Sequence, residues 1–357
     1  MHKKLFIPGP VEVRDDVLQK MATPMIGHRS KAASNLQRGI AEKCQKLFYT
    51  NDTILLSTTS GSGLMEGAIR SCTNKRAAVF SVGAFGDRWY EMAIANNVPV
   101  DKFKVEQGNV TLAEHVEEAL KTGKYDLITV THNETSSGIM NPVEEIAEVM
   151  KKYPEVIYCL DTVSSMAGTK IEVDKLGVDI CITSTQKCIG LPPGMAIASV
   201  SQKAIEAAKK VQFRGLYLDI LGLYECVIEK DNQYPSTPSI SHMYALDYQL
   251  DRIMAEGMEN RFARHKEMAD YVRAWAADKF EMFASELKYA SNTLTTIKNT
   301  RGISVSDLNK ELGLRGFEIS NGYGKLKEKT FRIAHMADCT LPEVKELIGQ
   351  IEDILKI

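Results

Sequence analysis

Three groups with binding or catalytic chemistry follow strand-like segments in the first 200 residues. The first is the turn Ser60-Gly61-Ser62-Gly63, which opens a helical pattern. Free backbone amides at the positive end of a helix favour an anion such as a phosphate. A dinucleotide-binding fingerprint would need GxGxxG, but the third glycine comes one position late, at Gly67. Taken alone, this segment is equally well explained as an ordinary strand-to-helix turn.

The other two groups are Asp161 and Lys187. Asp161 ends an otherwise apolar strand pattern, at the strand end where open α/β sheets bind ligands. A buried carboxylate there needs a cationic or N–H partner, although a helix cap would by itself explain this aspartate better. Lys187 precedes the apolar, Gly- and Pro-rich segment 189–194. Most lysines after strands are solvated, but desolvation here would lower the lysine pKa, as a Schiff-base nucleophile requires.

Together the three groups match what pyridoxal phosphate (PLP) demands of a protein. Its phosphate needs N–H donors, its pyridine nitrogen needs a carboxylate in order to stay protonated, and its aldehyde needs a lysine amine. The combination is much more specific than any one of its parts.

The elements that must position these groups alternate between short apolar runs and helical segments from residue 50 to 200. This pattern predicts βαβ units around a mainly parallel sheet of seven strands. The expected strands are 53–57, 77–82, 100–105, 127–131, 156–160, 178–183 and 196–200. Thr111 with Glu114 predicts a capping box that opens a helix to Leu120, and Asn141-Pro142 predicts the start of a helix that runs to Tyr153.

The C-terminal third predicts a smaller α+β domain. A long helical pattern over 242–278 is expected to bridge the two domains, followed by strands at 294–298, 317–320 and 331–335. The apolar stripe after Thr340 predicts a final helix that packs on a surface. We therefore expect an N-terminal arm (1–20), a large cofactor domain (21–257) and a small domain (258–357).

Composition excludes several classes of protein. The 44 Lys plus Arg against 46 Asp plus Glu give a net charge of −2, which argues against a nucleic-acid or membrane-surface binder. No run of 18 apolar residues occurs, and two prolines and a glycine interrupt the first ten residues, where a signal peptide would be apolar. The seven scattered cysteines, never spaced as CxxC, predict reduced thiols in a cytoplasmic protein without a metal site.

Seven segments, in order along the chain, resemble class V PLP-dependent aminotransferases, closest to the serine:pyruvate and alanine:glyoxylate branch. They are Pro8-Gly9-Pro10, Gly27-His28-Arg29-Ser30, Ser60-Gly61-Ser62-Gly63, Thr131-His132-Asn133-Glu134-Thr135-Ser136-Ser137-Gly138, Asp161-Thr162-Val163, Ser184-Thr185-Gln186-Lys187 and Thr330-Phe331-Arg332-Ile333. The resemblance covers essentially the whole chain. It implies the α/β architecture of a fold-type I PLP enzyme.

The resemblance also implies a role for each cofactor-binding residue. Lys187 would carry the cofactor aldehyde and move the substrate proton, and Asp161 would pair with the pyridine nitrogen. The remaining cofactor contacts would be phosphate binding by Ser62, Gly63 and Gln186, ring stacking by Phe85 and Val163, and a hydrogen bond from Thr135 to the phenolic oxygen or adjacent groups. Leu64 departs from the family, because some members carry a polar residue there that contacts the phosphate.

Further residues are implied to contact the substrate or the partner subunit. Arg332 would bind the substrate α-carboxylate, with Gly9 beside it. Tyr234 and Thr237 would reach the phosphate of the neighbouring subunit, so the resemblance implies a homodimer with shared active sites. Without a partner, a surface loop would explain this segment.

Whether three further residues set the choice of substrate is left open by the sequence. His28 and Arg29 lie in a segment that approaches the partner's site in relatives, where they could recognise a second anionic group. Tyr323, between two glycines near Arg332, could limit the size of the pocket. Dimer contacts and a turn would explain the same residues without a role in specificity.

The leading hypothesis is a PLP-dependent transaminase that moves an amino group between serine, alanine or a similar amino acid and pyruvate or glyoxylate. Within the family, an aspartate, phosphoserine or 2-aminoethylphosphonate transaminase is an alternative. A cysteine desulfurase would need a catalytic cysteine on a mobile loop, whereas Cys339 directly precedes a helical pattern. A non-catalytic complex subunit has no need for a buried carboxylate, and a nucleotide-binding oxidoreductase is disfavoured by the displaced Gly67.

Overall fold

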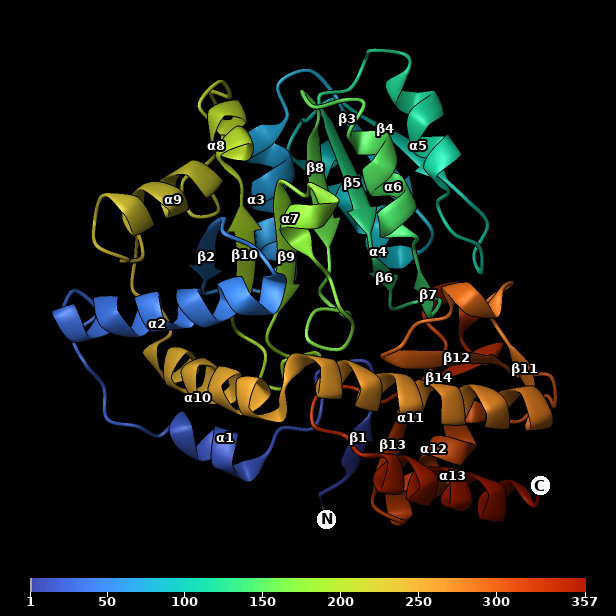
Figure 1. The fold of residues 1–357 in the computed structure, drawn as a ribbon. Coiled ribbons are helices and arrows are strands. Elements are labelled where there is room, and N and C mark those ends of the chain that lie inside the picture. Colours follow the sequence, from blue (N-terminus) through green and yellow to red (C-terminus); the bar gives the residue numbers. More distant parts are fainter. Residues whose placement is uncertain (1) are drawn as a thin grey trace.

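A seven-stranded sheet organises the larger part of the chain (Figure 1). The computed structural model describes residues 2–357. The sheet order is β2-β10-β9-β8-β5-β3-β4, in which β10 is antiparallel to both β2 and β9 and the other pairs are parallel. The strands are β2 (Thr53–Ser57), β3 (Ala77–Ser81), β4 (Val100–Lys104), β5 (Leu127–Thr131), β8 (Ile157–Asp161), β9 (Ile180–Ser184) and β10 (Ala196–Val200). The prediction of seven mainly parallel strands is confirmed.

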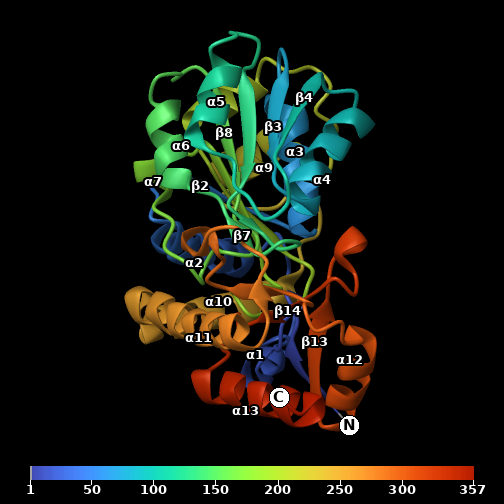
Figure 2. The same ribbon diagram turned by 90° about the vertical axis from the view of Figure 1, so that its right-hand side faces the viewer.

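Helices cover both faces of this sheet (Figure 2). Successive strand residues point to opposite faces, so Val79 enters one apolar core and Phe80 the other. The core that contains Phe80 is closed by α2 (Lys31–Phe48), α5 (Ala113–Leu120), α6 (Val143–Met150) and α10 (Ile240–Glu256). The core that contains Val79 is closed by α3 (Gly61–Cys72), α4 (Ala84–Ala95), α8 (Gln202–Ala208) and α9 (Ile220–Ile228). Burial on both faces explains why the strand segments are apolar throughout.

A second sheet, of order β1-β13-β14-β12-β11, lies beside the first. Its strands are β1 (Lys4–Phe6), β11 (Glu281–Met282), β12 (Leu294–Lys298), β13 (Phe317–Asn321) and β14 (Thr330–Ala334). A third apolar core joins it to α11 (Met258–Lys279), α12 (Val305–Leu314) and α13 (Leu341–Leu355). The predicted final helix is confirmed as α13. No strand was predicted in the N-terminal arm, yet β1 runs parallel to β13 and forms one edge of this sheet.

Three predictions about helices need correction. The long pattern over 242–278 forms two helices, because the backbone at Gly257 turns to φ 84° between α10 and α11. The cap of α5 is Leu112, whose amide is bound by the His115 ring, so the predicted capping box at Thr111 and Glu114 is wrong. The helix expected to reach Tyr153 ends at Met150. The division of the chain into an N-terminal arm and two domains, at residues 20 and 257, stays a prediction.

The remaining elements are short. They are α1 (Asp15–Lys20), β6 (Asn133–Glu134), β7 (Ile139–Met140), α7 (Val173–Leu176) and the 3-10 helices η1 (Leu287–Tyr289) and η2 (Gly324–Leu326). Across residues 2–357 no helix is both long and apolar enough to span a bilayer. All seven cysteines are free thiols, and six of them are buried, as predicted.

Candidate active site

The candidate site lies at the carboxyl ends of the central strands. The chain runs from β3 outward to β4 and then returns to β5 on the other side of β3, so its direction across the sheet reverses there. Ligands bind in the crevice formed at such a reversal in open α/β sheets. Phe85, Thr135 and Lys187 lie in the segments that leave β3, β5 and β9, and Asp161 is the last residue of β8.

Lys187 is buried three residues after the end of β9. Its ammonium donates a hydrogen bond to the backbone carbonyl of Pro8. Gly9 lies directly against the lysine, since a Cβ at this position would come 2.7 Å from Cδ and 2.8 Å from Nζ. Burial, and next the charge of Arg332, lower the pKa of Lys187 to about 8. The expected desolvated lysine is therefore present, and the solvated alternative is wrong.

Asp161 is the last residue of β8 and is almost fully buried. Its Oδ1 accepts a hydrogen bond of 2.9 Å from the amide of Val163. Within residues 2–357 it forms no ion pair, and burial raises its pKa to about 7. A protonated ring nitrogen would supply the positive partner that this carboxylate lacks.

The turn at residues 60–63, which is predicted to bind a phosphate, opens α3. Ser60 is the N-cap residue but its side chain makes no capping bond, and within the described chain the amides of Gly61 and Ser62 have no acceptor. A Cβ on Gly63 would come 2.3 Å from Thr59 Oγ1, and one on Gly61 would come 2.7 Å from Val163. The turn thus presents free amide donors on a backbone too closely packed for larger residues, which suits a phosphate.

A buried glutamate that sequence reasoning overlooked ties together two loops of the site. Glu134 is fully buried and accepts hydrogen bonds from the amides of Phe85 (3.0 Å) and Gly86 (3.1 Å) at the start of α4. Its other oxygen accepts from the amide (3.0 Å) and hydroxyl (2.6 Å) of Ser136. Burial raises the pKa of Glu134 despite these four donors. The glutamate therefore holds the turn that carries Thr135 against the helix that carries Phe85.

Arg332 reaches the site from β14. Its guanidinium donates to the carbonyls of Thr135 (3.0 Å) and Asn321 (3.1 and 3.2 Å), and burial lowers its pKa to about 10. Within residues 2–357 no carboxylate pairs with it. Tyr323 lies over the guanidinium, 5.7 Å from its ring centroid to Cζ, and 5.8 Å from the ring of Phe85. Arg332 is thus a charged, largely dehydrated donor without an internal anion, which is the arrangement needed for a substrate carboxylate.

The other predicted contacts are distributed around this centre. The Thr135 hydroxyl donates to Ser164 Oγ at 2.9 Å. Gln186 is half-buried, and its Oε1 has no partner within residues 2–357, so the amide is free to bind a ligand. Val163 packs beside Gly61 at the base of the phosphate turn. Their contacts with a cofactor stay predictions.

The segment expected to reach the partner subunit packs beside the phosphate turn of its own chain. The buried Tyr234 accepts a hydrogen bond from the amide of Thr58 at 3.2 Å, whereas Thr237 is exposed. Arg29 donates to four acceptors in this segment: the carbonyls of Tyr234, Pro235 and Ser236 and the side chain of Gln233. Within one chain Arg29 therefore orders the Tyr234 loop and does not reach Lys187 or Arg332, so its role at a partner's site stays a prediction.

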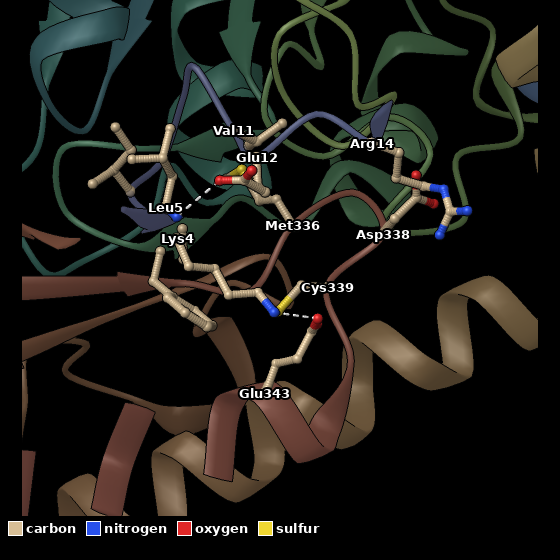
Figure 3. Close-up of a pocket in the computed structure, with 12 residues that line it drawn as sticks. Lys4, Leu5, Val11, Glu12, Arg14, Met336, Asp338, Cys339 and Glu343 are labelled. Atoms are coloured by element: carbon tan, nitrogen blue, oxygen red, sulfur yellow. Dashed lines mark hydrogen bonds and ion pairs between the residues drawn. The ribbon is translucent and has the colours of Figure 1, made fainter. Parts of the chain in front are cut away.

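Cys339 lies in a separate pocket of about 110 Å³ between β1 and the segment after β14 (Figure 3). Lys4 and Glu343 form an ion pair beside it. Neither Lys187 nor Asp161 lines this pocket, and burial raises the pKa of the thiol to about 12. A protonated thiol outside the site cannot serve as the nucleophile of a desulfurase.

Comparison with known proteins adds independent evidence. The family model described as Aminotransferase class-V matches residues 18–333. An uncharacterized aminotransferase of Methanocaldococcus jannaschii is 40% identical over 99% of this chain and 93% of its own. L-aspartate–glyoxylate aminotransferase of Paracoccus denitrificans is 30% identical over 94% of this chain and 87% of its own. The solved alanine–glyoxylate aminotransferase of Nostoc sp. has a TM-score of 0.93 at 27% identity, and the match covers 99% of this chain and 96% of that one.

Proposed function

The chain belongs to the class V aminotransferases, and from this premise we propose that it moves an amino group from serine, alanine or a similar small amino acid to pyruvate or glyoxylate. One observation carries the proposal. The buried Lys187, which follows a strand of the large sheet, and Arg332, which lies on a strand of the small sheet and has no carboxylate partner within residues 2–357, meet at the same site. A reacting amine and a carboxylate receptor are the two groups that an amino-acid transaminase must supply.

The residues present fit PLP. The amides of Gly61 and Ser62 would hold its phosphate, Asp161 its pyridine nitrogen and Lys187 its aldehyde. When bound, PLP supplies an electron sink that stabilises negative charge at the substrate α-carbon. The fully buried Glu134 fixes the loops around this position without entering it.

The protein's own residues would perform binding, orientation and proton transfer. A pKa of about 8 leaves part of the Lys187 population neutral near pH 7, so its Nζ can accept a proton from the substrate α-carbon and return it. The guanidinium of Arg332 would fix the α-carboxylate and so orient the bond to be broken. Tyr323 and Phe85 would exclude water from this end of the site.

The test is a reconstitution and activity matrix. PLP-saturated protein is assayed with serine, alanine, aspartate and phosphoserine against glyoxylate, pyruvate and 2-oxoglutarate. We expect the highest kcat/KM for a small donor, and the highest value for aspartate or phosphoserine would shift the assignment to the alternatives. Lys187→Ala should abolish both turnover and the visible absorption of bound cofactor, with Lys170→Ala as the control. A Lys187→Ala variant that is fully active and still absorbs visible light would refute the proposal.

We also propose a homodimer in which Tyr234 and Thr237 contribute to the partner's site. The support is an exposed apolar cluster at Phe213 (85% exposed), Leu216 (91%) and Tyr217 (52%). The Tyr217 hydroxyl donates to the carbonyl of Thr58, the residue that also binds Tyr234, so this cluster adjoins the phosphate turn. Such apolar exposure is typical of interaction surfaces. Light scattering of wild type and of Leu216→Asp should show a dimer and a monomer, respectively.

We propose a cytoplasmic location from the cysteines, as in the analysis of the sequence. The seven thiols are unpaired, which suits a reducing compartment. Fractionation of the native cells would test it, and recovery of the protein outside the cytoplasm would refute it.

A further inference from the structure

Arg88 on α4 is a guanidinium at the site that no function described above uses. Its Nη1 donates to the hydroxyl of Ser62 at 3.4 Å, and its Cζ lies 4.9 Å from the ring centroid of Phe85. It is half-buried, and within residues 2–357 it forms no ion pair. The adjacent Asp87 does not neutralise it, because that carboxylate binds Lys102 (3.1 Å) and Lys104 (2.7 Å). A partly dehydrated cation without an anion requires an explanation.

The position of this charge points to the phosphate turn. Burial is the main cause of the raised pKa of Asp161 and of the lowered pKa of Lys187, and the positive charge of Arg88 adds a smaller effect that lowers both, so Arg88 lies close enough to act on groups of the site. The other two cations of the site donate to backbone carbonyls: Lys187 to Pro8, and Arg332 to Thr135 and Asn321. Arg88 instead contacts a side chain of the turn itself.

The turn lacks a charged donor of its own. Its first helical residues supply backbone amides and the Ser62 hydroxyl, and the next residue is the fully buried, apolar Leu64. A phosphate dianion held by neutral donors alone would be poorly compensated in a buried position. A planar guanidinium within reach of Ser62 would provide the missing charge.

We propose that Arg88 binds the phosphate of the cofactor and takes the place of a polar side chain at position 64. Because its guanidinium packs on Phe85, the same residue couples the phosphate end of the site to the stacking aromatic. The inference rests on the proposed function only in taking PLP as the cofactor.

The experiment compares PLP with pyridoxal, which lacks the phosphate. Dissociation constants are measured by absorbance titration of cofactor-free wild type, Arg88→Met and Arg88→Lys, with Arg76→Met as the charge-matched control at an ion pair with Asp101. For Arg88→Met we expect PLP affinity to fall about ten- to hundredfold, as for loss of a charged hydrogen bond, while pyridoxal affinity stays unchanged. Arg88→Lys should recover part of the loss. Inorganic phosphate should compete with PLP in wild type and much less in Arg88→Met.

The two ligands separate the possible outcomes. Equal weakening of PLP and pyridoxal would assign Arg88 to Phe85 packing, and unchanged PLP affinity would exclude a phosphate contact; either result overturns the inference. If Arg88→Met does not fold, Arg88→Lys provides the test. The inference is then overturned if this variant binds PLP and pyridoxal with wild-type affinities and phosphate competes with PLP as in wild type. Wild type that binds no PLP would instead refute the proposed function.

Discussion

The carbonyl oxygen of Thr135 accepts a hydrogen bond of 3.0 Å from Nη1 of Arg332, which joins a turn of the large sheet to strand β14 of the small one. Because the Asn321 carbonyl binds the opposite edge of the guanidinium, Arg332 is held from both sides. With a pKa of about 10 the group is charged at neutral pH. The contact thus fixes an anion receptor relative to Lys187 before any substrate arrives.

Loss of this receptor should be visible in substrate binding. Arg332→Met removes charged hydrogen bonds to the α-carboxylate, so we expect kcat/KM for the amino donor and for the 2-oxo acid to fall by roughly ten- to hundredfold or more. Arg332→Lys should retain part of the activity. The measurement is steady-state kinetics with both substrates, and PLP affinity serves as the control. Equal kinetics in Arg332→Met and wild type would exclude the carboxylate contact.

Asp161 should make the cofactor-free protein less stable as the pH rises. Its pKa is about 7 in the folded state against 3.8 in its ordinary state, so between about pH 4 and pH 7 the folded state binds more protons than the unfolded state. Stability therefore falls through this window and the full penalty is present above pH 7. Asp161→Asn, which can still accept from Val163, should be more stable than wild type at pH 8, by up to about 4 kcal/mol.

Denaturant unfolding of the PLP-free proteins at pH 8 and pH 4 checks this prediction. The unfolding free energies of the two proteins should come close together at pH 4, because the Asp161 carboxyl is then protonated in the folded state and, with an ordinary pKa of 3.8, partly protonated in the unfolded state. Asp278→Asn, an exposed carboxylate on α11, should show no comparable gain. A constant difference between Asp161→Asn and wild type across this pH range would contradict the assigned cause.

Sequence reasoning was strongest where the signal was local. The seven apolar runs of the large sheet were assigned correctly because burial on both faces makes each run apolar throughout. Asp161 and Lys187 were identified because a charged residue at the end of such a run is conspicuous. The break at Gly257 was missed because a single glycine within a helical pattern is usually tolerated.

Contacts between segments far apart in the chain could not be predicted from the sequence. Strand β1 has only three residues and is held by pairing with β13, more than 300 positions away, so no local sequence pattern predicts this strand. The role of Glu134 could not be predicted either. It is a charged residue in the polar run after β5, but its partners at Phe85 and Gly86 lie almost 50 residues earlier in the chain. Arg88 lies three positions after the predicted stacking residue Phe85, but its contact with Ser62 depends on how α3 and α4 pack.

Glu134 should be essential for the shape of the site. In Glu134→Gln the amide group would face backbone N–H donors or the Ser136 hydroxyl, so we expect a loss of about 1–3 kcal/mol in unfolding free energy and a changed visible circular dichroism of bound PLP. Gly83→Ala should act similarly, since its Cβ would come 2.5 Å from Glu134 Cγ. Glu148→Gln, an exposed residue of α6, is the matched control. Wild-type stability and dichroism in Glu134→Gln would show that the four hydrogen bonds are dispensable.

Tyr323 should restrict the size of the substrate side chain. Its ring contacts both Phe85 and Arg332, so it occupies space beside the group that binds the α-carboxylate. Tyr323→Ala should raise kcat/KM for leucine or phenylalanine relative to alanine by about tenfold, the scale set by one or two methylene contacts in a pocket. Tyr323→Phe should keep the wild-type ratio, because the ring and not the hydroxyl fills the space. Lys325→Ala, exposed in the same loop, controls for loop mobility. If Tyr323→Ala left the ratio of large to small donors unchanged, the ring would have no part in specificity.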